Sequence, residues 1–168
     1  MSMKLTERRF EFDFSNAIDA FKFDETDKTL SNYHGLSCMK AVDFIIECDD
    51  KWVFVEVKDY KVPNQSCPTD FSQQTEKDKL LKSLVGKYRD TFLYRWAEGK
   101  IDKPVQYICL INIESPLVSY LMSRLQGQLP VGKASSKWRD GIAQSAVVVN
   151  IEAWNENFSD WPVIIREH

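Results

Sequence analysis

Two β-rich runs near the middle of the chain restrict its fold more than any other feature. Residues 42–48 (VDFIIEC) and 52–58 (WVFVEVK) are dominated by β-branched and aromatic side chains, and the acidic residues Asp49 and Asp50 between them suit a tight turn. These features predict a β-hairpin closed by a two-residue loop. In that register Cys48 faces Lys51 and Asp43 faces Glu56, with facing Cβ atoms about 5 Å apart.

The two faces of this hairpin differ in chemistry because side chains alternate along a strand. One face is wholly apolar and is predicted to be core. The other face carries Ile45 and Phe54 in its middle and gathers Asp43, Glu56 and Lys58 at one end. Charges at the end of buried strands are costly unless they are compensated, and two facing carboxylates can hold one divalent cation. The competing interpretation is an ordinary surface ion pair between Glu56 and Lys58.

The rest of the chain alternates between strand and helix patterns. The strand patterns lie at residues 10–14, 105–113, 146–151 and 163–165, and the one at 105–113 is expected to be central. The helix patterns lie at residues 15–22, from 69 or 70 to 99, at 115–126, and in a turn containing Trp154. Strands alternating with helices predict an α/β fold in one domain spanning residues 1–168, with a mixed central β-sheet flanked by helices.

Composition excludes several classes of protein. A chain of 168 residues with a formal net charge of −3 is not a uniformly basic nucleic-acid coat. Its four cysteines form no C-x-x-C pair and it has two histidines, so a zinc motif is absent. The sequence shows no signal-peptide pattern and no apolar run of about 20 residues. We therefore expect a cytoplasmic protein without a membrane partner.

Asp43, followed after twelve residues by Glu56-Val57-Lys58, resembles the active-site signature of the PD-(D/E)XK nuclease superfamily, the restriction-endonuclease-like enzymes. The resemblance implies an αβββαβ core, here with added C-terminal strands and a helix. It also implies that Mg²⁺, with Mn²⁺ as a possible substitute, is bound by Asp43, Glu56 and the carbonyl of Val57. Lys58 would position water or neutralise phosphate charge.

By this resemblance the chain is a Mg²⁺-dependent nuclease that hydrolyses phosphodiester bonds of nucleic acid, DNA more than RNA. Val42 stands where the family often has a proline. Many members add an acid from near the N-terminus, for which Asp19, Asp24 and Glu25 compete here, and we favour Asp24.

Candidate contacts to nucleic acid come from basic residues outside this signature. Residues 58–103 hold ten lysines and arginines against seven acids, and Lys61 lies close behind the Glu-Val-Lys motif. A second basic group surrounds Trp138 and consists of Lys133, Lys137 and Arg139. Solvated lysines and a packing tryptophan are the alternatives. Because this positive charge is modest, a homodimer or a partner subunit is a further expectation. A nuclease-like scaffold or interaction module without turnover is the competing function.

Overall fold

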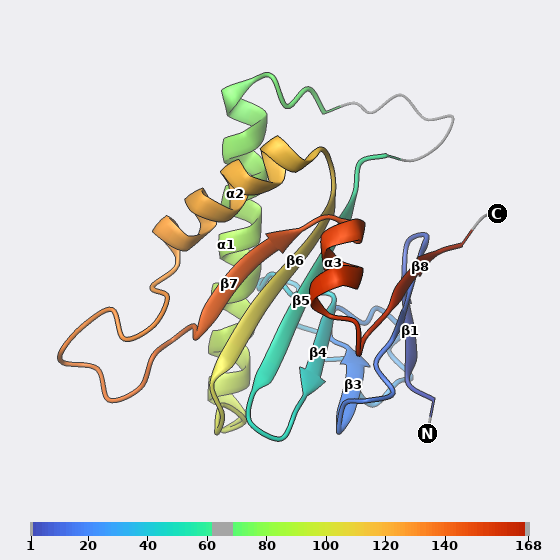
Figure 1. Cartoon of the computed structure of the whole chain (residues 1–168). Helices are drawn as coiled ribbons and strands as arrows, with labels where there is room; N and C mark the ends of the chain where they lie inside the picture. Colours follow the sequence, from blue (N-terminus) through green and yellow to red (C-terminus); the bar gives the residue numbers. More distant parts are fainter. Residues whose placement is uncertain (1, 62–68, 167–168) are drawn as a thin grey trace.

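The computed structural model describes residues 2–61 and 69–166 (Figure 1). Within these ranges the chain forms two β-sheets and three helices. In chain order the elements are β1 (Lys4–Glu7), β2 (Phe10–Asp13), β3 (Asp19–Lys22), β4 (Phe44–Glu47), β5 (Trp52–Asp59), α1 (Gln74–Ala97), β6 (Val105–Asn112), α2 (Ser115–Gln128), β7 (Ser145–Val149), α3 (Ile151–Asn157) and β8 (Val163–Ile165).

The larger sheet is mixed, as the sequence predicts. Its strand order is β3-β4-β5-β6-β7. β4 is antiparallel to both of its neighbours, β3 and β5, whereas β5, β6 and β7 are parallel and are connected through α1 and α2. β5 is therefore the middle strand of the sheet. The strand expected to be central, at residues 105–113, is β6, which lies inside the sheet beside β5. The predicted strand at 146–151 is also found, as β7, at an edge of the sheet.

The central hairpin has the predicted register. Phe44 faces Val55 and Ile46 faces Val53, and the backbone N–H of Cys48 donates to the carbonyl of Lys51 at 3.0 Å. Continuing this ladder by one residue places Asp43 opposite Glu56. β4 itself begins at Phe44, so Asp43 lies directly before the strand.

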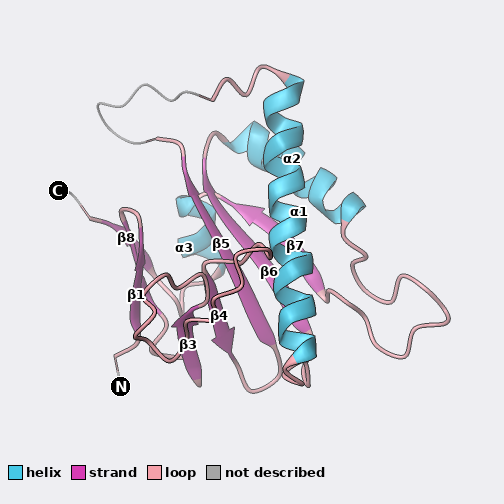
Figure 2. Ribbon diagram, turned by 180° about the vertical axis from the view of Figure 1, so that it is seen from behind, coloured by secondary structure: helices cyan, strands magenta, loops and turns pink. Residues whose placement is uncertain are grey.

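Helices α1 and α2 cover one face of the large sheet, and the smaller sheet together with α3 covers the other (Figure 2). On the helix side, Ile45, Phe54 and Tyr107 pack with the buried face of α1 and α2. On the opposite side, β1, β2 and β8 form a three-stranded sheet whose Phe10 and Phe12 pack with Trp154 of α3. Because the central strands are buried on both faces, their sequences read as nearly continuous apolar runs.

The predicted helix at residues 15–22 is wrong, because residues 19–22 form strand β3 instead. Asp19 faces Glu47 and Lys22 faces Phe44 in an antiparallel ladder. The hydroxyl of Ser15, expected to cap the helix, donates to Asp13. A helix of two turns is marginal by itself, whereas pairing with β4 satisfies the backbone of this segment.

Two further boundaries differ from expectation. The long helix begins at Gln74 rather than at 69 or 70, because Asp70 accepts from the backbone N–H of Ser72 in a turn that precedes the helix. Strand β1 is not predicted by the sequence pattern. None of the helices in the described ranges combines the length and apolarity that a membrane crossing requires.

Candidate active site and metal centre

Charged side chains from five elements converge at one end of the large sheet, on the side covered by α1. The end of β3, the beginning of β4 and the last residues of β5 lie there, and β5 is placed between β4 and β6. The sequence-predicted residues Asp43, Glu56 and Lys58 are brought together at this place.

Asp43 is held in a fixed position by the neighbouring strand. It is 4% exposed, and its Oδ2 accepts a hydrogen bond of 2.6 Å from the backbone N–H of Val57. Its other oxygen, Oδ1, lies 3.8 Å from Nζ of Lys87 on α1. Val57, predicted to offer its carbonyl to a metal, therefore contributes its N–H to the orientation of Asp43.

Glu56 is fully buried and lies between two ammonium groups. Its Oε1 is 2.7 Å from Nζ of Lys87 and 3.0 Å from Nζ of Lys58. Burial, together with the nearby charge of Asp43, raises the pKa of Glu56 from 4.5 to about 7, although both lysines oppose this rise. Burial acts to lower the pKa of Lys87, but the charges of Glu56 and Asp43 outweigh it and the pKa is raised.

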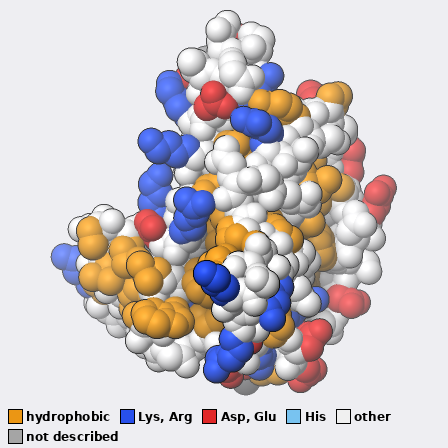
Figure 3. Space-filling model, turned by 90° about the vertical axis from the view of Figure 1, so that its left-hand side faces the viewer, with side chains coloured by type: hydrophobic (Ala, Val, Ile, Leu, Met, Phe, Trp, Pro, Cys, Tyr) orange, Lys and Arg blue, Asp and Glu red, His pale blue; other side chains and the backbone are white. Residues whose placement is uncertain are grey.

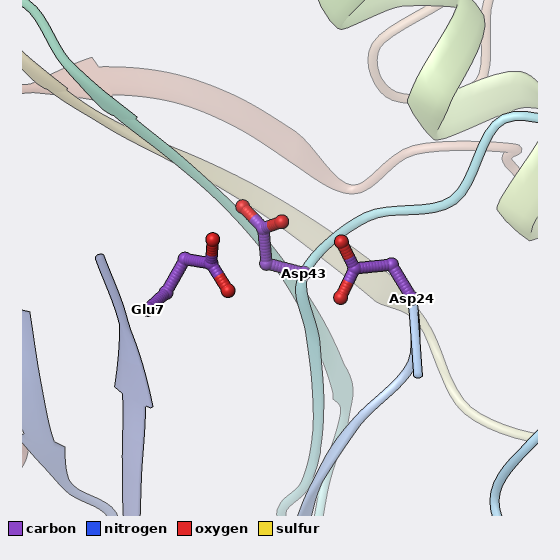
Figure 4. A group of neighbouring side chains, drawn as sticks. All are labelled: Glu7, Asp24 and Asp43. Atoms are coloured by element: carbon purple, nitrogen blue, oxygen red, sulfur yellow. The ribbon is translucent and has the colours of Figure 1, made fainter. Parts of the chain in front are cut away.

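A second acid group shares Asp43 with this pair. Carboxylate oxygens of Glu7, Asp24 and Asp43 all lie within 4.8 Å of one another, with Asp43 between the other two (Figure 4). Asp24 is the predicted accessory acid, and it lies just beyond the end of β3. Glu7 comes from the end of β1, and its Oε2 is 2.9 Å from Nζ of Lys22.

The negative charge of Asp24 is not compensated within this acid group. Burial, and then the charge of Asp43, raises its pKa from 3.8 to about 7. Its Oδ1 is buried and accepts no hydrogen bond from the described residues, and the nearest ammonium, that of Lys22, is 4.0 Å away. Buried carboxylate oxygens without a donor are the ligands that a hard divalent cation takes.

A buried ion pair anchors the hairpin that carries Glu7. Arg9, in the turn between β1 and β2, donates to Oδ2 of Asp59 at 2.7 Å and to its Oδ1 at 3.2 Å. Asn112 of β6 donates to the same carboxylate at 3.0 Å. Asp59 thus connects the small sheet to the end of β5, three residues beyond Glu56.

The predicted nucleic-acid contacts lie outside this centre. Lys61 is exposed and its Nζ is 2.8 Å from Oε1 of Glu114. Lys133, Lys137 and Arg139 lie on the loop between α2 and β7, and Figure 3 shows lysine and arginine side chains spread over that side of the molecule.

This loop joins the sheet at the end opposite to Lys58. It is closed there by the bridge between Val131 and Ala143 and by the hydrogen bond from Gln144 N–H to the carbonyl of Val105, which is paired with Trp52. Six residues of strand, about 20 Å, separate Trp52 from Lys58.

Two residues of the centre, Glu7 and Lys22, were missed by sequence reasoning, and Lys87 was included only among the basic residues of 58–103 that could contact nucleic acid. Lys87 had a signal, since it lies at helical spacing with the buried residues Leu84 and Thr91, and a lysine inside an apolar stripe calls for a buried partner. Glu7 had none. Its hairpin turns at Arg8, a non-glycine residue with a φ of 54°, where no Gly or Asn marks the turn.

Comparisons of the chain with protein-family models, with curated proteins and with solved structures find no match. Four carboxylates and three ammonium groups meet there: Glu7, Asp24, Asp43 and Glu56, with Lys22, Lys58 and Lys87. Such a group can bind a divalent cation, neutralise a phosphate and exchange a proton near neutral pH.

Proposed function

We propose that this chain is a metal-dependent nuclease that hydrolyses phosphodiester bonds of nucleic acid, DNA more than RNA. The observation that carries the proposal is the convergence of Asp43, Glu56 and Lys58 at one end of the sheet, with Asp43 shared by a three-carboxylate group. The order β3-β4-β5-α1-β6 supports assignment to the PD-(D/E)XK superfamily. The β1–β2 hairpin then stands where the resemblance implies an N-terminal helix.

The donor set fits Mg²⁺ or Mn²⁺. Asp43 and Asp24 would hold the ion, with Glu7 beside them, since these are the carboxylates whose oxygens approach one another and since Asp24 Oδ1 has no donor among the described residues. Glu56 is outside that group and contacts lysines, which differs from the ligand pair implied by the resemblance. When bound, the ion would supply charge neutralisation on the phosphoryl oxygens and a water of lowered pKa.

Lys58 and Glu56 would perform the remaining chemistry. The ammonium of Lys58 is partly exposed, at 21%, and can approach a phosphoryl oxygen on which negative charge accumulates. The carboxyl of Glu56, with a pKa of about 7, is suited to take a proton from water or to return one to the leaving oxygen at neutral pH. Lys87 keeps that carboxyl in place.

One observation favours the competing function, a nuclease-like scaffold without turnover. Lys87 and Lys58 already form ion pairs with Glu56, so this carboxylate has cationic partners without a metal ion. In the scaffold the centre would be a structural ion-pair network, and removal of divalent metal would leave its stability unchanged.

The test is cleavage of a substrate panel with Mg²⁺, Mn²⁺ or EDTA. The panel holds supercoiled, linear, branched and single-stranded DNA and a single-stranded RNA, and each substrate is incubated with the wild type and with Lys58→Ala. The nuclease cuts at least one DNA substrate only with metal, and the variant does not. If folded wild-type protein cuts nothing and no divalent ion raises its melting temperature, the scaffold function replaces the nuclease.

A further inference from the structure

A pocket of about 290 Å³ opens directly beside Lys58, between the turn of the β1–β2 hairpin and the first half of α1. Its volume is at the lower bound of ligand pockets, which start near ~300 Å³. The described residues that line it include Arg8, Lys58, Tyr60, Phe71, Lys79 and Ser83. We call it the Tyr60–Phe71 pocket.

The aromatic side of the pocket offers ring surface. The rings of Tyr60 and Phe71 meet edge to face, with centroids 4.9 Å apart and an interplanar angle of 90°. Both residues are only half-buried. Half-exposed rings beside a charged site are surfaces on which a planar base can stack.

The other side of the pocket is positively charged. Arg8 is exposed and forms no ion pair with any residue the structure describes, and Lys58 reaches the pocket from the active site. The two acids in the lining are already compensated, because Asp59 is bound by Arg9 at 2.7 Å and Glu76 by Lys79 at 2.6 Å. The pocket therefore combines cations for one phosphate with rings for one base.

We propose that the Tyr60–Phe71 pocket binds a single unpaired nucleotide, with its phosphate against Arg8 and Lys58 and its base on the aromatic rings. A base inside a duplex has both faces stacked, so it can reach these rings only when it is unpaired. The proposal rests on the proposed function for the identity of the neighbouring site, and it adds that the substrate strand is single at the point of cutting.

Binding in EDTA tests this pocket separately from cleavage. Fluorescence anisotropy compares dye-labelled oligothymidine, a DNA duplex of the same length, and an oligomer with the same sugar-phosphate backbone but no bases. We expect the wild type to bind oligothymidine at least tenfold more tightly than the duplex. Thymidine monophosphate, which has the base and phosphate but no strand, should compete at least tenfold more weakly than the oligomer, and equal affinity would overturn the assignment to a strand.

Two variants separate the two halves of the pocket. Phe71→Ala should weaken oligothymidine binding about 5- to 150-fold, the range for loss of one base stack, and leave binding of the base-free oligomer unchanged. Arg8→Gly is compatible with the positive φ of that turn. It should weaken the binding of oligothymidine and of the base-free oligomer, and reduce the slope of log K against log salt concentration by about 0.7. Leu93→Ala and Lys100→Ala, both at exposed positions near the other end of α1, are the controls.

The outcomes distinguish this proposal from the nuclease itself. Equal affinity for single strand and duplex, or a Phe71→Ala variant that stays folded and binds as the wild type does, would overturn the pocket assignment whether or not the protein cuts DNA. Tight single-strand binding sensitive to Phe71→Ala, in a protein that cuts nothing, would support the pocket and contradict the nuclease. If Phe71→Ala lowers the melting temperature by more than a few degrees, Arg8→Gly and the base-free oligomer still decide the result.

Discussion

The ammonium of Lys87 lies 2.7 Å from Oε1 of Glu56, and this contact connects helix α1 to the middle strand of the large sheet at the candidate active site. Both groups are removed from water, since the side chain of Lys87 is 17% exposed and that of Glu56 is fully buried. A buried charge pair of this kind is expensive to break from one side, because the remaining charge is left without a partner.

Replacement of any one residue of the predicted triad should abolish cleavage while the fold is kept. We expect Asp43→Asn, Glu56→Gln and Lys58→Ala each to lower the rate by about 10²- to 10³-fold or more, because each removes a charge that acts on the reacting phosphate or its metal. Lys51→Ala, in the turn at the other end of the same hairpin, is the matched control. Full activity in all three variants, with unchanged circular dichroism, would contradict the assignment.

Metal affinity should rise with pH through neutrality. The pKa of Asp24, one of the proposed ligands, is raised to about 7, so at lower pH this carboxyl is protonated and a cation must displace the proton. We expect the association constant for Mn²⁺ to increase about tenfold per pH unit for each proton released below pH 7, and to level off above about pH 8. Isothermal titration in buffers of different ionisation enthalpy counts the protons, and a flat affinity between pH 5.5 and 8 would exclude carboxylate ligands with raised pKa values.

Without metal, the stability of the protein should change with pH in the opposite sense. The pKa of Glu56 is raised from 4.5 to about 7 on folding, so its neutral form favours the folded state. This contribution, on the order of 3 kcal/mol, is complete below about pH 4.5 and is lost as the pH rises to 7. Urea unfolding in EDTA at pH 5.5 and 7.5 measures the decline of this contribution. The pKa of Asp24 is also raised to about 7 and acts in the same sense, so Glu56→Gln should remove part of the difference, and Glu56→Gln combined with Asp24→Asn most of it.

The Lys87 contact separates the two candidate functions. Because Lys87 opposes the rise in the pKa of Glu56, Lys87→Met should raise that pKa further. In a nuclease that uses Glu56 as a base, the pH at half-maximal rate then moves upward. In a scaffold, only the free energy of unfolding changes. Lys82→Met, at an exposed position on the same helix, should alter neither quantity.

Loss of the Arg9–Asp59 ion pair should weaken metal binding by the acid group, although neither residue belongs to that group. Arg9→Ala leaves the buried carboxylate of Asp59 with Asn112 but without its cation, which costs about 3 kcal/mol and loosens the hairpin that carries Glu7. We expect weaker Mn²⁺ binding together with the lower stability. Arg139→Ala, which breaks an ion pair between two exposed residues, should leave both unchanged.

Much of the sheet could be predicted from the sequence because its signals are local. The β-branched runs and the acidic turn predicted the hairpin and its register, and that register placed Asp43 opposite Glu56. Helix caps were less informative, since Ser15 and Asp70 bind neighbouring groups in turns and do not begin helices. A side chain that can cap a helix can equally close a turn, so sequence spacing alone does not separate these two uses.

The rest of the site depends on contacts distant in sequence. Glu7 lies beside Asp43 in a hairpin that the Arg9–Asp59 ion pair attaches to β5, and no local pattern encodes a pairing between residues fifty positions apart. The basic loop is a different case. Lys133, Lys137 and Arg139 are predicted as nucleic-acid contacts by composition, and the bridge between Val131 and Ala143 places their loop at the end of the sheet away from Lys58.

The pairing of β2 with β8 also orders events during synthesis of the protein. Phe10 faces Ile165, so the hairpin that presents Glu7 is completed by a strand made about 150 residues later. While translation is in progress, the central hairpin with Glu56 and Lys58 has left the ribosome but the strand that secures Glu7 has not. The acid group is therefore complete only after residues 163–165 have emerged from the ribosome.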